Sequence, residues 1–400
     1  MKKRILILGA GMLQNFVIKK AKELNYEVHV LDMNPDSIGF QLADKYEVIN
    51  IVDKELCLKY AIENKIDGVL TAATDYGVLT ASYIAEKMKL NGLKYNVAEI
   101  IKNKYEVRKK LFENKADDTK QFFEVKNNSD LLKIKDKIDF PVILKPVDGS
   151  GSKGVTKVES KLELEEATKN ALEMSISKKV LIESFIDGKE YGVESFVLNN
   201  QIYVLGIMNK EMTTPPIYAE LGHSIPSQLS IDIEKKIVET VKNTIKSLGI
   251  NYGAVNMDLL ITKENNIHIV DIGARMGGNL IGSHIIPLST GIDYMANIIK
   301  ASVGDSVDFE KKYNKPVATK ILALKPGIVK KIPNLKEMYT ANTNDIICNL
   351  KENDQINEYK NNLDGCGYVV GVGNNIIDLI KEVSEIKEQI NKNIIRENEK

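Results

Sequence analysis

Short runs of aliphatic and β-branched residues alternate with amphipathic stretches along the first hundred residues. The runs at 5–8, 27–31 and 68–71 predict strands, and the stretches at 13–24, 55–64 and 76–90 predict helices. Strands that alternate with helices are typical of a parallel sheet with helices on its faces. We therefore expect the chain to begin with a Rossmann-like parallel-sheet domain.

The pattern changes after Pro141. A strand at 142–144, a loop rich in Gly and Ser at 148–154, a second strand and an amphipathic helix at 162–174 follow one another. This order predicts a small, separate α+β lobe.

Residues 189–271 read mostly as alternating strands, interrupted by one helix at 231–248, which predicts an antiparallel sheet with one face covered. Beyond residue 325 the chain returns to short strands, one of them at 368–372. It closes on a charged helix at 376–394. The predicted fold class is therefore α/β and α+β in several domains.

The chain has 400 residues, which favours two or three domains, and its 55 Lys and Arg residues balance 55 Asp and Glu residues. Because there is no basic excess, we expect no nucleic-acid partner and no binding to an anionic membrane. No apolar run approaches the roughly 18 residues of a membrane span, and the run before Gly9 is too short for a secretory signal. Cys57, Cys348 and Cys366 lie far apart, as expected for reduced thiols in a cytoplasmic protein.

Two glycines follow the first predicted strand. Gly9 and Gly11 open a helix, and Asp32 ends the next strand, where a dinucleotide fold has its ribose-binding acid. The third glycine of that motif is missing, because Gln14 stands in its place. We interpret the glycines as a tight strand-to-helix turn, and a nicotinamide-dependent dehydrogenase stays open as the alternative.

A second glycine-rich loop follows Lys145, which ends a strand that Pro146 stops. The loop contains Gly149, Ser150, Gly151, Ser152 and Gly154. Glycines let the main chain approach a phosphate closely and take positive φ angles. It is not a P-loop, since no Gly-Lys-Ser/Thr ends it and no helix starts there. We expect it to hold nucleotide phosphates, the plainer alternative being a flexible hairpin.

The strand at 180–186 carries an acid followed by apolar residues, and another acid lies on the next strand. An adenine needs an apolar slot with backbone polar groups at its edge, and a ribose needs a carboxylate that accepts from its hydroxyls. The candidates are Glu183, Ser184, Phe185, Ile186 and Glu190. Taken alone, these residues are equally typical of ordinary strand ends.

Asp258 and Asp271 lie on two strands that are predicted to form a hairpin. If residues 265–266 make the turn, Asp258 faces Gly273 and Leu260 faces Asp271. Both aspartates then lie on one face, one diagonal step apart, with Cα atoms about 7–8 Å from each other. Two bare carboxylates at this separation repel each other, and a hard divalent cation between them removes the repulsion. We expect a metal site here, and two solvated aspartates are the alternative.

Arg275 lies four residues after Asp271, in a segment rich in glycine. Its guanidinium offers two parallel donors to a phosphate or a carboxylate. Metal carboxylates, a flexible glycine loop, a lysine and an arginine together indicate phosphoryl transfer.

In this order, the motifs resemble the ATP-grasp superfamily, in its branch of carbamoyl phosphate synthase-like proteins and carboxylate–amine (L-amino acid) ligases. Lys104, at the start of a predicted helix, and Lys145 are similar to the two nucleotide-binding lysines of that family, with residues 149–154 as its phosphate flap. The resemblance also makes residues 183–186 the adenine hinge and Glu190 the ribose acid.

The same resemblance assigns the metal and substrate residues. Asp258 and Asp271 match the metal-binding acids, and Arg275 matches the arginine that holds the transferred group. The segment at 219–226 is similar to a substrate-side stretch of carboxylate–amine ligases. The implied catalytic residues are Arg275, Lys145 and His223, and the implied substrate contacts are Glu220, His223, Arg275, Gly278 and Asn279. A structural role is the alternative for His223.

The metal motif departs from the family's pattern. The second acid there is commonly Glu, followed two residues later by Asn, whereas here Asp271 is followed by Gly273. One side-chain oxygen ligand is thus lost and another is shortened. The number of bound ions therefore stays open.

The resemblance implies four segments: a Rossmann-like domain at 1–102, an ATP-grasp central lobe at 103–188, an antiparallel C-domain at 189–325 and a C-terminal α/β subdomain at 326–400. It implies ATP with Mg²⁺ or Mn²⁺ as cofactors and a carboxylate and an amine as small-molecule substrates, and it allows a homodimer. The expected reaction forms an amide through an acyl phosphate and releases ADP and phosphate. A bicarbonate-activating, carboxylase-like enzyme is the alternative within the superfamily.

Overall fold

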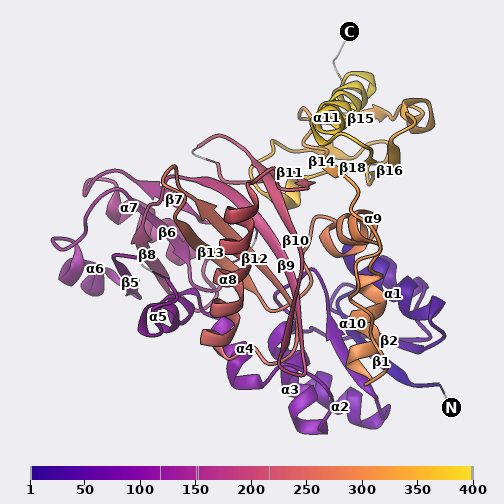
Figure 1. Ribbon diagram of the computed structural model, residues 1–400, viewed down its shortest axis with the longest axis horizontal. Coiled ribbons are helices and arrows are strands. Elements are labelled where there is room, and N and C mark those ends of the chain that lie inside the picture. Colours follow the sequence, from indigo (N-terminus) through magenta and orange to yellow (C-terminus); the bar gives the residue numbers. More distant parts are fainter. Residues whose placement is uncertain (1, 118, 150, 152, 216, 398–400) are drawn as a thin grey trace.

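A computed structural model describes residues 2–117, 119–149, 151, 153–215 and 217–397 (Figure 1). The described residues form four sheets, the largest of which runs from the middle of the chain into its C-terminal part. Among the described residues, no helix is long and apolar enough to pass through a bilayer.

The first sheet is parallel, with strand order β3-β2-β1-β4, which confirms the prediction from alternating strands and helices. Its elements are β1 (Arg4–Leu8), α1 (Met12–Glu23), β2 (Glu27–Asp32), β3 (Lys45–Val48), α2 (Lys54–Glu63), β4 (Gly68–Thr71) and α3 (Val78–Met88). One face of β1 packs with α2 and α3, and the other packs with α1 and with α10 (Tyr294–Ser302). A helix from far along the chain thus completes the core of this domain.

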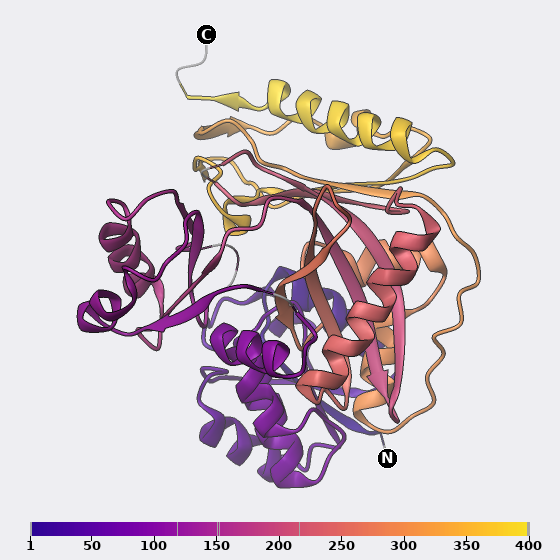
Figure 2. The same cartoon turned by 60° about the vertical axis from the view of Figure 1, so that its left-hand side comes forward.

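The predicted small lobe is a separate antiparallel sheet with the strand order β5-β8-β6-β7. Its elements are β5 (Phe122–Val125), α6 (Asn128–Ile134), β6 (Val142–Pro146), β7 (Thr156–Val158), α7 (Leu164–Met174) and β8 (Val180–Ser184). Val142, Leu144 and Ile182 pack with Ala167 and Ala171 of α7 in a core of its own. In both ribbon views this lobe projects from the rest of the molecule (Figures 1 and 2).

The largest sheet has eight strands in the order β13-β12-β9-β10-β11-β14-β18-β16, and neighbouring strands pair in the antiparallel sense. The strands are β9 (Lys189–Leu198), β10 (Gln201–Met212), β11 (Glu220–Ile225), β12 (Gly253–Ile261), β13 (Ile267–Gly273), β14 (Val317–Ile321), β16 (Thr343–Cys348) and β18 (Gly367–Val372). The antiparallel prediction is confirmed, and the sheet continues through β14 into the C-terminal segment.

The expectation that only one face of this sheet would be covered is wrong. Helix α8 (Ile231–Leu248) covers one face together with α4 (Tyr95–Lys102) and α5 (Lys104–Glu113). On the other face, α9 (Ile286–Thr290) and α10 share a core with residues of β9 and β10. For this reason β9 has seven buried residues in succession instead of an alternating pattern.

The C-terminal segment lies over one end of the eight-stranded sheet. Helix α11 (Ile376–Asn393), predicted from its charged amphipathic pattern, packs against β14 and β18, and Figure 2 shows it in yellow above those strands. A small sheet of β15 (Gly327–Lys331), β17 (Gln355–Ile356) and β19 (Ile395–Arg396) flanks it.

Gly222 marks the seam between β11 and β14. A Cβ atom at this position would lie 2.2 Å from the carbonyl oxygen of Thr319. We expect Gly222→Ala to lower the free energy of unfolding by about 1–3 kcal/mol, because the two backbones must separate.

Gly192→Ala in β9 is the matched control. A Cβ there would meet its nearest neighbour, a side-chain atom of Met208, at 3.6 Å. We expect this variant to keep the wild-type stability or to gain up to about 1 kcal/mol, since alanine is preferred over glycine inside a strand. Chemical denaturation compares the two, and equal free energies of unfolding would contradict the tight seam.

Candidate active site

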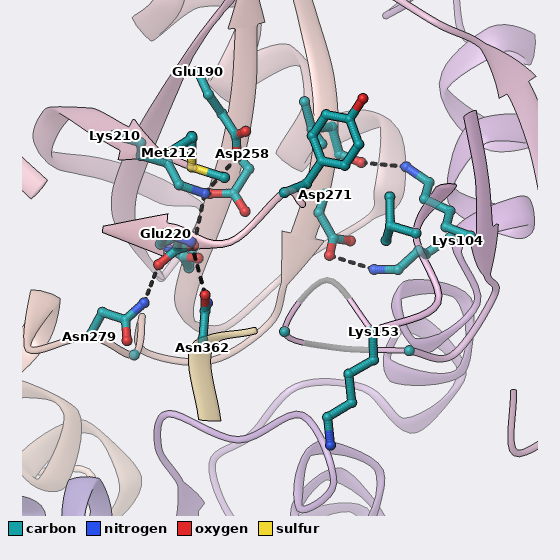
Figure 3. Close-up of a pocket in the computed structure, with 18 of the residues that line it drawn as sticks. Lys104, Lys153, Glu190, Lys210, Met212, Glu220, Asp258, Asp271, Asn279 and Asn362 are labelled. Carbon is teal, nitrogen blue, oxygen red and sulfur yellow. Dashed lines mark hydrogen bonds and ion pairs between the residues drawn. The ribbon is translucent and has the colours of Figure 1, made fainter. Parts of the chain in front are cut away.

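A cavity of about 900 Å³ lies where the first domain, the lobe, the eight-stranded sheet and the C-terminal segment meet. Its lining includes Leu13, Asp75, Lys104, Lys145, Gly149, Gly151, Phe185, Glu190, Lys210, Glu220, His223, Asp258, Asp271, Arg275, Gly278, Asn279 and Leu363. Most of the predicted site residues are therefore brought together, and Figure 3 shows how the charged ones face one another.

Two lysines enter the cavity from different elements. Asn103 caps α5 by accepting from the backbone N–H groups of Tyr105 and Glu106, and this cap places Lys104 on the first turn. The Lys104 ammonium pairs with Asp271 (Figure 3). Lys145, buried at the end of β6, donates to the carbonyl oxygen of Val270 at 2.9 Å. Both lysines thus reach strand β13.

Glu183 lines the cavity and is paired with two cations. Its carboxylate lies between Lys145, at 2.6 Å, and Arg108, at 2.8 Å, and all three side chains are buried. Burial alone would raise the pKa of Glu183, but Arg108 and Lys145 hold it below its usual value. Glu183 is therefore placed to fix the position of the Lys145 ammonium.

Arg108 is a residue that the sequence did not point to. Its guanidinium also pairs with Asp117 at 2.7 Å and donates to the carbonyl oxygen of Ile269 at 2.8 Å. It therefore links helix α5 to the lobe and to β13. No motif marks it, because its partners come from three separate stretches of the chain.

The glycine-rich loop after β6 is anchored at its start. The Asp148 carboxylate accepts from the backbone N–H of Ser177 at 2.7 Å and from the Ser175 hydroxyl at 2.9 Å. Gly151 and Gly154 adopt positive φ angles of 66° and 70°, which glycine takes at little cost, whereas Gly149 does not.

Two further flap residues, Ser150 and Ser152, lie outside the described residues. Lys153 extends from the loop away from Asp271 (Figure 3).

The proposed adenine hinge follows β8. Ser184, Phe185 and Ile186 all line the cavity, and the Lys157 ammonium lies 4.2 Å from the centre of the Phe185 ring. Glu190, near the start of β9, lines the same cavity. An apolar surface and an acid are thus available next to the flap.

The predicted register of the two metal acids is wrong by two residues. Asp258 lies directly opposite Asp271, not on a diagonal to it. Ile261 pairs with Ile267, so the loop is longer than two residues, and a bulge at Val270 shifts the later pairs by one. The expectation that both carboxylates share one face is confirmed, because directly paired residues point to the same side.

Lys210, another residue that the sequence did not point to, lies among three acids. Its ammonium is 2.7 Å from Glu190, 2.9 Å from Glu220 and 2.9 Å from Asp258 (Figure 3). Burial raises the pKa of Asp258 to about 7, against the effect of Lys210, and the Glu190 and Glu220 carboxylates contribute in the same direction. One ammonium thus compensates three carboxylates only in part.

Asp258 and Asp271 fit a divalent cation that is shared with a phosphate ligand. They are opposed across two strands and line one cavity. Within the described chain, no group of three or more His, Cys, Asp or Glu side chains is arranged to hold a metal. Mg²⁺ is commonly held by one or two carboxylates plus phosphate oxygens, and this pair matches that donor set.

Arg275 joins the eight-stranded sheet to the first domain. Its guanidinium contacts both carboxylate oxygens of Asp75, at 3.0 and 3.1 Å. Buried Glu194 accepts from the backbone N–H of Gly277, two residues after Arg275, at 3.2 Å and from the Tyr294 hydroxyl at 2.7 Å. Glu194 therefore supports the glycine segment that carries Arg275, Gly278 and Asn279.

The C-terminal segment contributes to the same end of the cavity. The backbone N–H of Glu220 donates to the Asn362 side chain at 3.0 Å, and the Tyr368 hydroxyl donates to Asn279 at 3.0 Å. The Asn279 amide in turn donates to the Glu220 carboxylate (Figure 3). The C-terminal segment thus positions Glu220 and Asn279, two of the substrate contacts implied by the resemblance.

His223 and Glu220 differ in charge at neutral pH. Burial would raise the pKa of Glu220, but Lys210 and His223 lower it to about 2. Burial lowers the pKa of His223 to about 4 in spite of the neighbouring Glu220 carboxylate. Within the described residues, Nδ1 of His223 is buried and has no hydrogen-bond partner, while the residue lines the cavity.

Side chains of the protein itself contact the glycine turn after β1, at the place where a dinucleotide would bind. The Asp32 carboxylate accepts from the backbone N–H of Ala10 at 2.7 Å. The Gln14 side chain packs against Gly9 and donates to the carbonyl oxygen of Ala72 at 2.6 Å. These contacts agree with the interpretation as a tight turn.

A family model described as an ATP-grasp domain matches residues 138–283. Formate-dependent phosphoribosylglycinamide formyltransferase of Prochlorococcus marinus (strain AS9601) is 32% identical over 194 residues, which cover 46% of this chain and 48% of that protein. The first curated relatives are thus matched over less than half of their length.

Two solved structures match nearly the whole chain. L-amino acid ligase from Bacillus licheniformis has a TM-score of 0.87 at 22% identity, with 99% of each chain covered. Phosphoribosylglycinamide synthetase from Anaerococcus prevotii has a TM-score of 0.81 at 25% identity, covering 99% of this chain and 100% of that one. The fold of nearly the whole chain, and not only of residues 138–283, is therefore similar to the folds of these two proteins.

The buried neutral state of His223 predicts a pH dependence of stability. Its pKa is about 4 in the folded chain and about 6.5 in an unfolded one. The unfolded state therefore binds more protons between these values, and His223 lowers stability as the pH falls below about 6.5. The slope is at most about 1.4 kcal/mol per pH unit.

Urea denaturation of the wild type and of His223→Gln at pH 5 to 7.5 measures this effect. We expect the wild type to lose stability relative to the variant as the pH falls. A difference that does not change with pH would contradict the buried neutral imidazole.

Proposed function

Because this chain is an ATP-grasp protein, with the matched domain at residues 138–283, we propose that it is an ADP-forming carboxylate–amine ligase. It activates a carboxylate as an acyl phosphate and joins the acyl group to an amine. The observation that carries the proposal is one cavity with two different ends. Lys104 and the flap lie at one end, and Glu220 and Asn279 lie at the other (Figure 3). Arg275 lies beside the phosphate end, because it lines a second, smaller cavity together with Lys104, Gly149 and Asp271.

The nucleotide lies at the end formed by the lobe. Phe185 and Ile186 offer the adenine an apolar slot, Glu190 accepts from the ribose hydroxyls, and Lys104 and Lys145 bind phosphate oxygens. Mg²⁺, when bound, neutralises charge on the β- and γ-phosphate oxygens. Asp258 and Asp271 would hold the ion, and the Lys104 ammonium, which pairs with Asp271, is within reach of the same phosphate oxygens.

Phosphoryl transfer takes place between the two ends. A carboxylate oxygen of the substrate attacks the γ-phosphorus, the bond to the β-phosphate oxygen breaks, and ADP leaves. The amine then attacks the carbonyl carbon, orthophosphate leaves, and the amine gives up a proton. Arg275, held by Asp75 at 3.0 Å, orients the acyl phosphate and stabilises charge on the tetrahedral species.

The charges at the substrate end favour a substrate without a phosphate group. Lys210 is already committed to three carboxylates, and Arg275, beside the phosphate end, is committed to Asp75. Glu220 is ionised and suits an ammonium or an amine, and neutral His223 suits a second polar atom. We therefore favour an amino acid over the phosphoribosyl compounds named for several relatives. This choice also ranks amide formation above a bicarbonate-activating reaction.

The purified protein is expected to bind ATP with Mg²⁺ and not to bind NADH at micromolar concentration. Lys145→Ala should weaken ATP binding by one to two decades, because the loss of a charged hydrogen-bond partner is worth about 1.5–3 kcal/mol. Isothermal titration calorimetry measures both. Lys179→Ala is the control, since Lys179 lies in the same lobe and pairs with Glu124 outside the cavity. A tight NADH isotherm without an ATP signal would restore the dehydrogenase alternative.

The products are expected to be ADP and orthophosphate, formed only when a carboxylate substrate is present. A screen of amino acids for stimulated ADP release identifies that substrate. Hydroxylamine should then trap the acyl phosphate as a hydroxamate, and Arg275→Ala should abolish the hydroxamate with a smaller effect on ATP affinity. Release of pyrophosphate, or an acyl-adenylate in the mass spectrum, would rule out the mechanism.

A further inference from the structure

The second, smaller cavity has a volume of about 40 Å³ and shares lining residues with the large one, among them Lys104, Gly149 and Arg275. Its lining also includes Lys102, the last residue of α4, which the sequence did not point to. A single water molecule needs about 10–15 Å³, so this space holds a few water molecules. It therefore suits a small ion of the size of one phosphate group.

The Lys102 ammonium is a half-buried cation without an acid as its partner. It lies 5.1 Å from the centre of the Tyr76 ring and 3.4 Å from the carbonyl oxygen of Asp148, which is long for a hydrogen bond. Within the described chain, no carboxylate forms an ion pair with it. Burial lowers the pKa of Lys102, and the Asp75 carboxylate offsets this only in part. The ammonium thus carries a charge that its neighbours leave uncompensated.

The acids that line the small cavity are engaged with other groups. Asp75 pairs with Arg275, Asp271 with Lys104 and Asp258 with Lys210, and Asp148 accepts from Ser175 and Ser177. Lys104 and Arg275, the other cations of the lining, are therefore balanced by acids. Among the described lining residues, Lys102 is the cation that is left for an anionic ligand.

Arg275 adds a second donor to the same cavity. A Cβ atom at Gly273, which lines this cavity, would lie 3.0 Å from the central carbon of the guanidinium, so the group lies against the backbone there. Its Nε is buried and has no hydrogen-bond partner among the described residues, although an oxygen of Asp75 lies 3.0 Å away. A buried donor without a partner lowers stability, and a ligand oxygen would supply that partner.

Lys102 also lies at the base of the glycine flap. The backbone N–H of Lys104 donates to the carbonyl oxygen of Val147 at 2.9 Å, and the Lys102 ammonium contacts the next carbonyl, that of Asp148. Gly149, the residue after it, lines the small cavity. The junction of α4 and α5 thus places the Lys102 ammonium where the flap begins.

We propose that the small cavity binds one phosphate group and that Lys102 is the lysine that binds it. The phosphate oxygens accept from the Lys102 ammonium and from Nε of Arg275. The identity of this group rests on the proposed function: it is the terminal phosphate of ATP before transfer and orthophosphate afterwards. The presence of an anion site at Lys102 does not rest on that function.

Calorimetry with two nucleotides separates a contact with the terminal phosphate from a structural role. ADP and the non-hydrolysable ATP analogue AMP-PNP are each titrated with Mg²⁺ into the wild type and Lys102→Met, which removes the charge and keeps an unbranched side chain. We expect the variant to bind AMP-PNP about one to two decades more weakly and ADP less than about threefold more weakly, because ADP lacks the group that Lys102 contacts.

Lys54→Met is the matched control. The Lys54 ammonium also lies over tyrosine rings, 4.7 Å from the centre of Tyr83 and 4.9 Å from that of Tyr95, but it is outside both cavities. We expect this variant to bind both nucleotides as the wild type does.

Inorganic phosphate tests the anion site without a nucleotide. Phosphate stabilises folded proteins in general, so the comparison is between variants at one phosphate concentration. We expect orthophosphate to raise the thermal midpoints of the wild type and of Lys54→Met by more than it raises that of Lys102→Met.

A third measurement needs only the wild type and decides the matter even where Lys102→Met does not fold. Orthophosphate is added to protein that is saturated with Mg²⁺ and either ADP or AMP-PNP. Because the terminal phosphate of AMP-PNP fills the proposed site and ADP leaves it free, the added phosphate should raise the thermal midpoint more with ADP.

Three outcomes would overturn the proposal. One is an equal loss of affinity for ADP and AMP-PNP in Lys102→Met, as expected if the lysine only supports the base of the flap. Another is unchanged affinity for both nucleotides. The third is an equal phosphate effect on the ADP-bound and AMP-PNP-bound wild type.

Failure of this proposal differs from failure of the proposed function. If the protein bound no nucleotide, the proposed function would fail, and the phosphate effect that depends on Lys102 would still be expected in the nucleotide-free protein. If ATP bound and Lys102→Met did not distinguish AMP-PNP from ADP, only the role of Lys102 would be lost.

Discussion

Charge that is buried in the cavity must be paired, and these pairs hold the parts of the molecule together around it. Arg108 links helix α5 to the lobe through Glu183, and Lys104 links the same helix to β13 through Asp271. Arg275 links the sheet to the first domain through Asp75. An unpaired charge at the buried Arg108–Glu183 pair would cost several kcal/mol, whereas the other two pairs are partly exposed and less costly to break.

This arrangement has a consequence for ligand binding. Lys104 is paired with Asp271, and Arg275 is paired with Asp75. A ligand that uses Lys104 or Arg275 must therefore compete with an ion pair that is already formed.

Much of the fold followed from the pattern of the sequence. The parallel first sheet, the lobe with its glycine loop and helix α8 were predicted with nearly their observed bounds, because each has a regular period. The covering of the second face of the large sheet was missed. It depends on α10, which packs against both the sheet and the first domain, and a packing partner far along the chain leaves no local signal.

The candidate site was also predicted only in part, because local motifs are visible in the sequence and contacts between distant segments are not. Residues in recognisable motifs, such as Lys145 and Asp271, line the cavity as expected. The register of Asp258 was missed because the loop between the two strands covers residues 262–266 and not the two residues assumed, and the bulge at Val270 reverses only one residue of that difference. Lys210 and Asp75 were missed because their partners come from other strands or another domain, and strand order is not visible in a single sequence.

Transfer of a labelled oxygen tests the central claim, that the two ends of the cavity meet in an acyl phosphate. The carboxylate substrate found in the ADP-release screen is labelled with ¹⁸O in its carboxyl group and turned over with ATP and Mg²⁺. Because the attacking carboxylate oxygen stays on phosphorus when the amine displaces it, each turnover should yield orthophosphate with one ¹⁸O, which ³¹P NMR detects. Unlabelled orthophosphate, or ¹⁸O in AMP, would contradict the account.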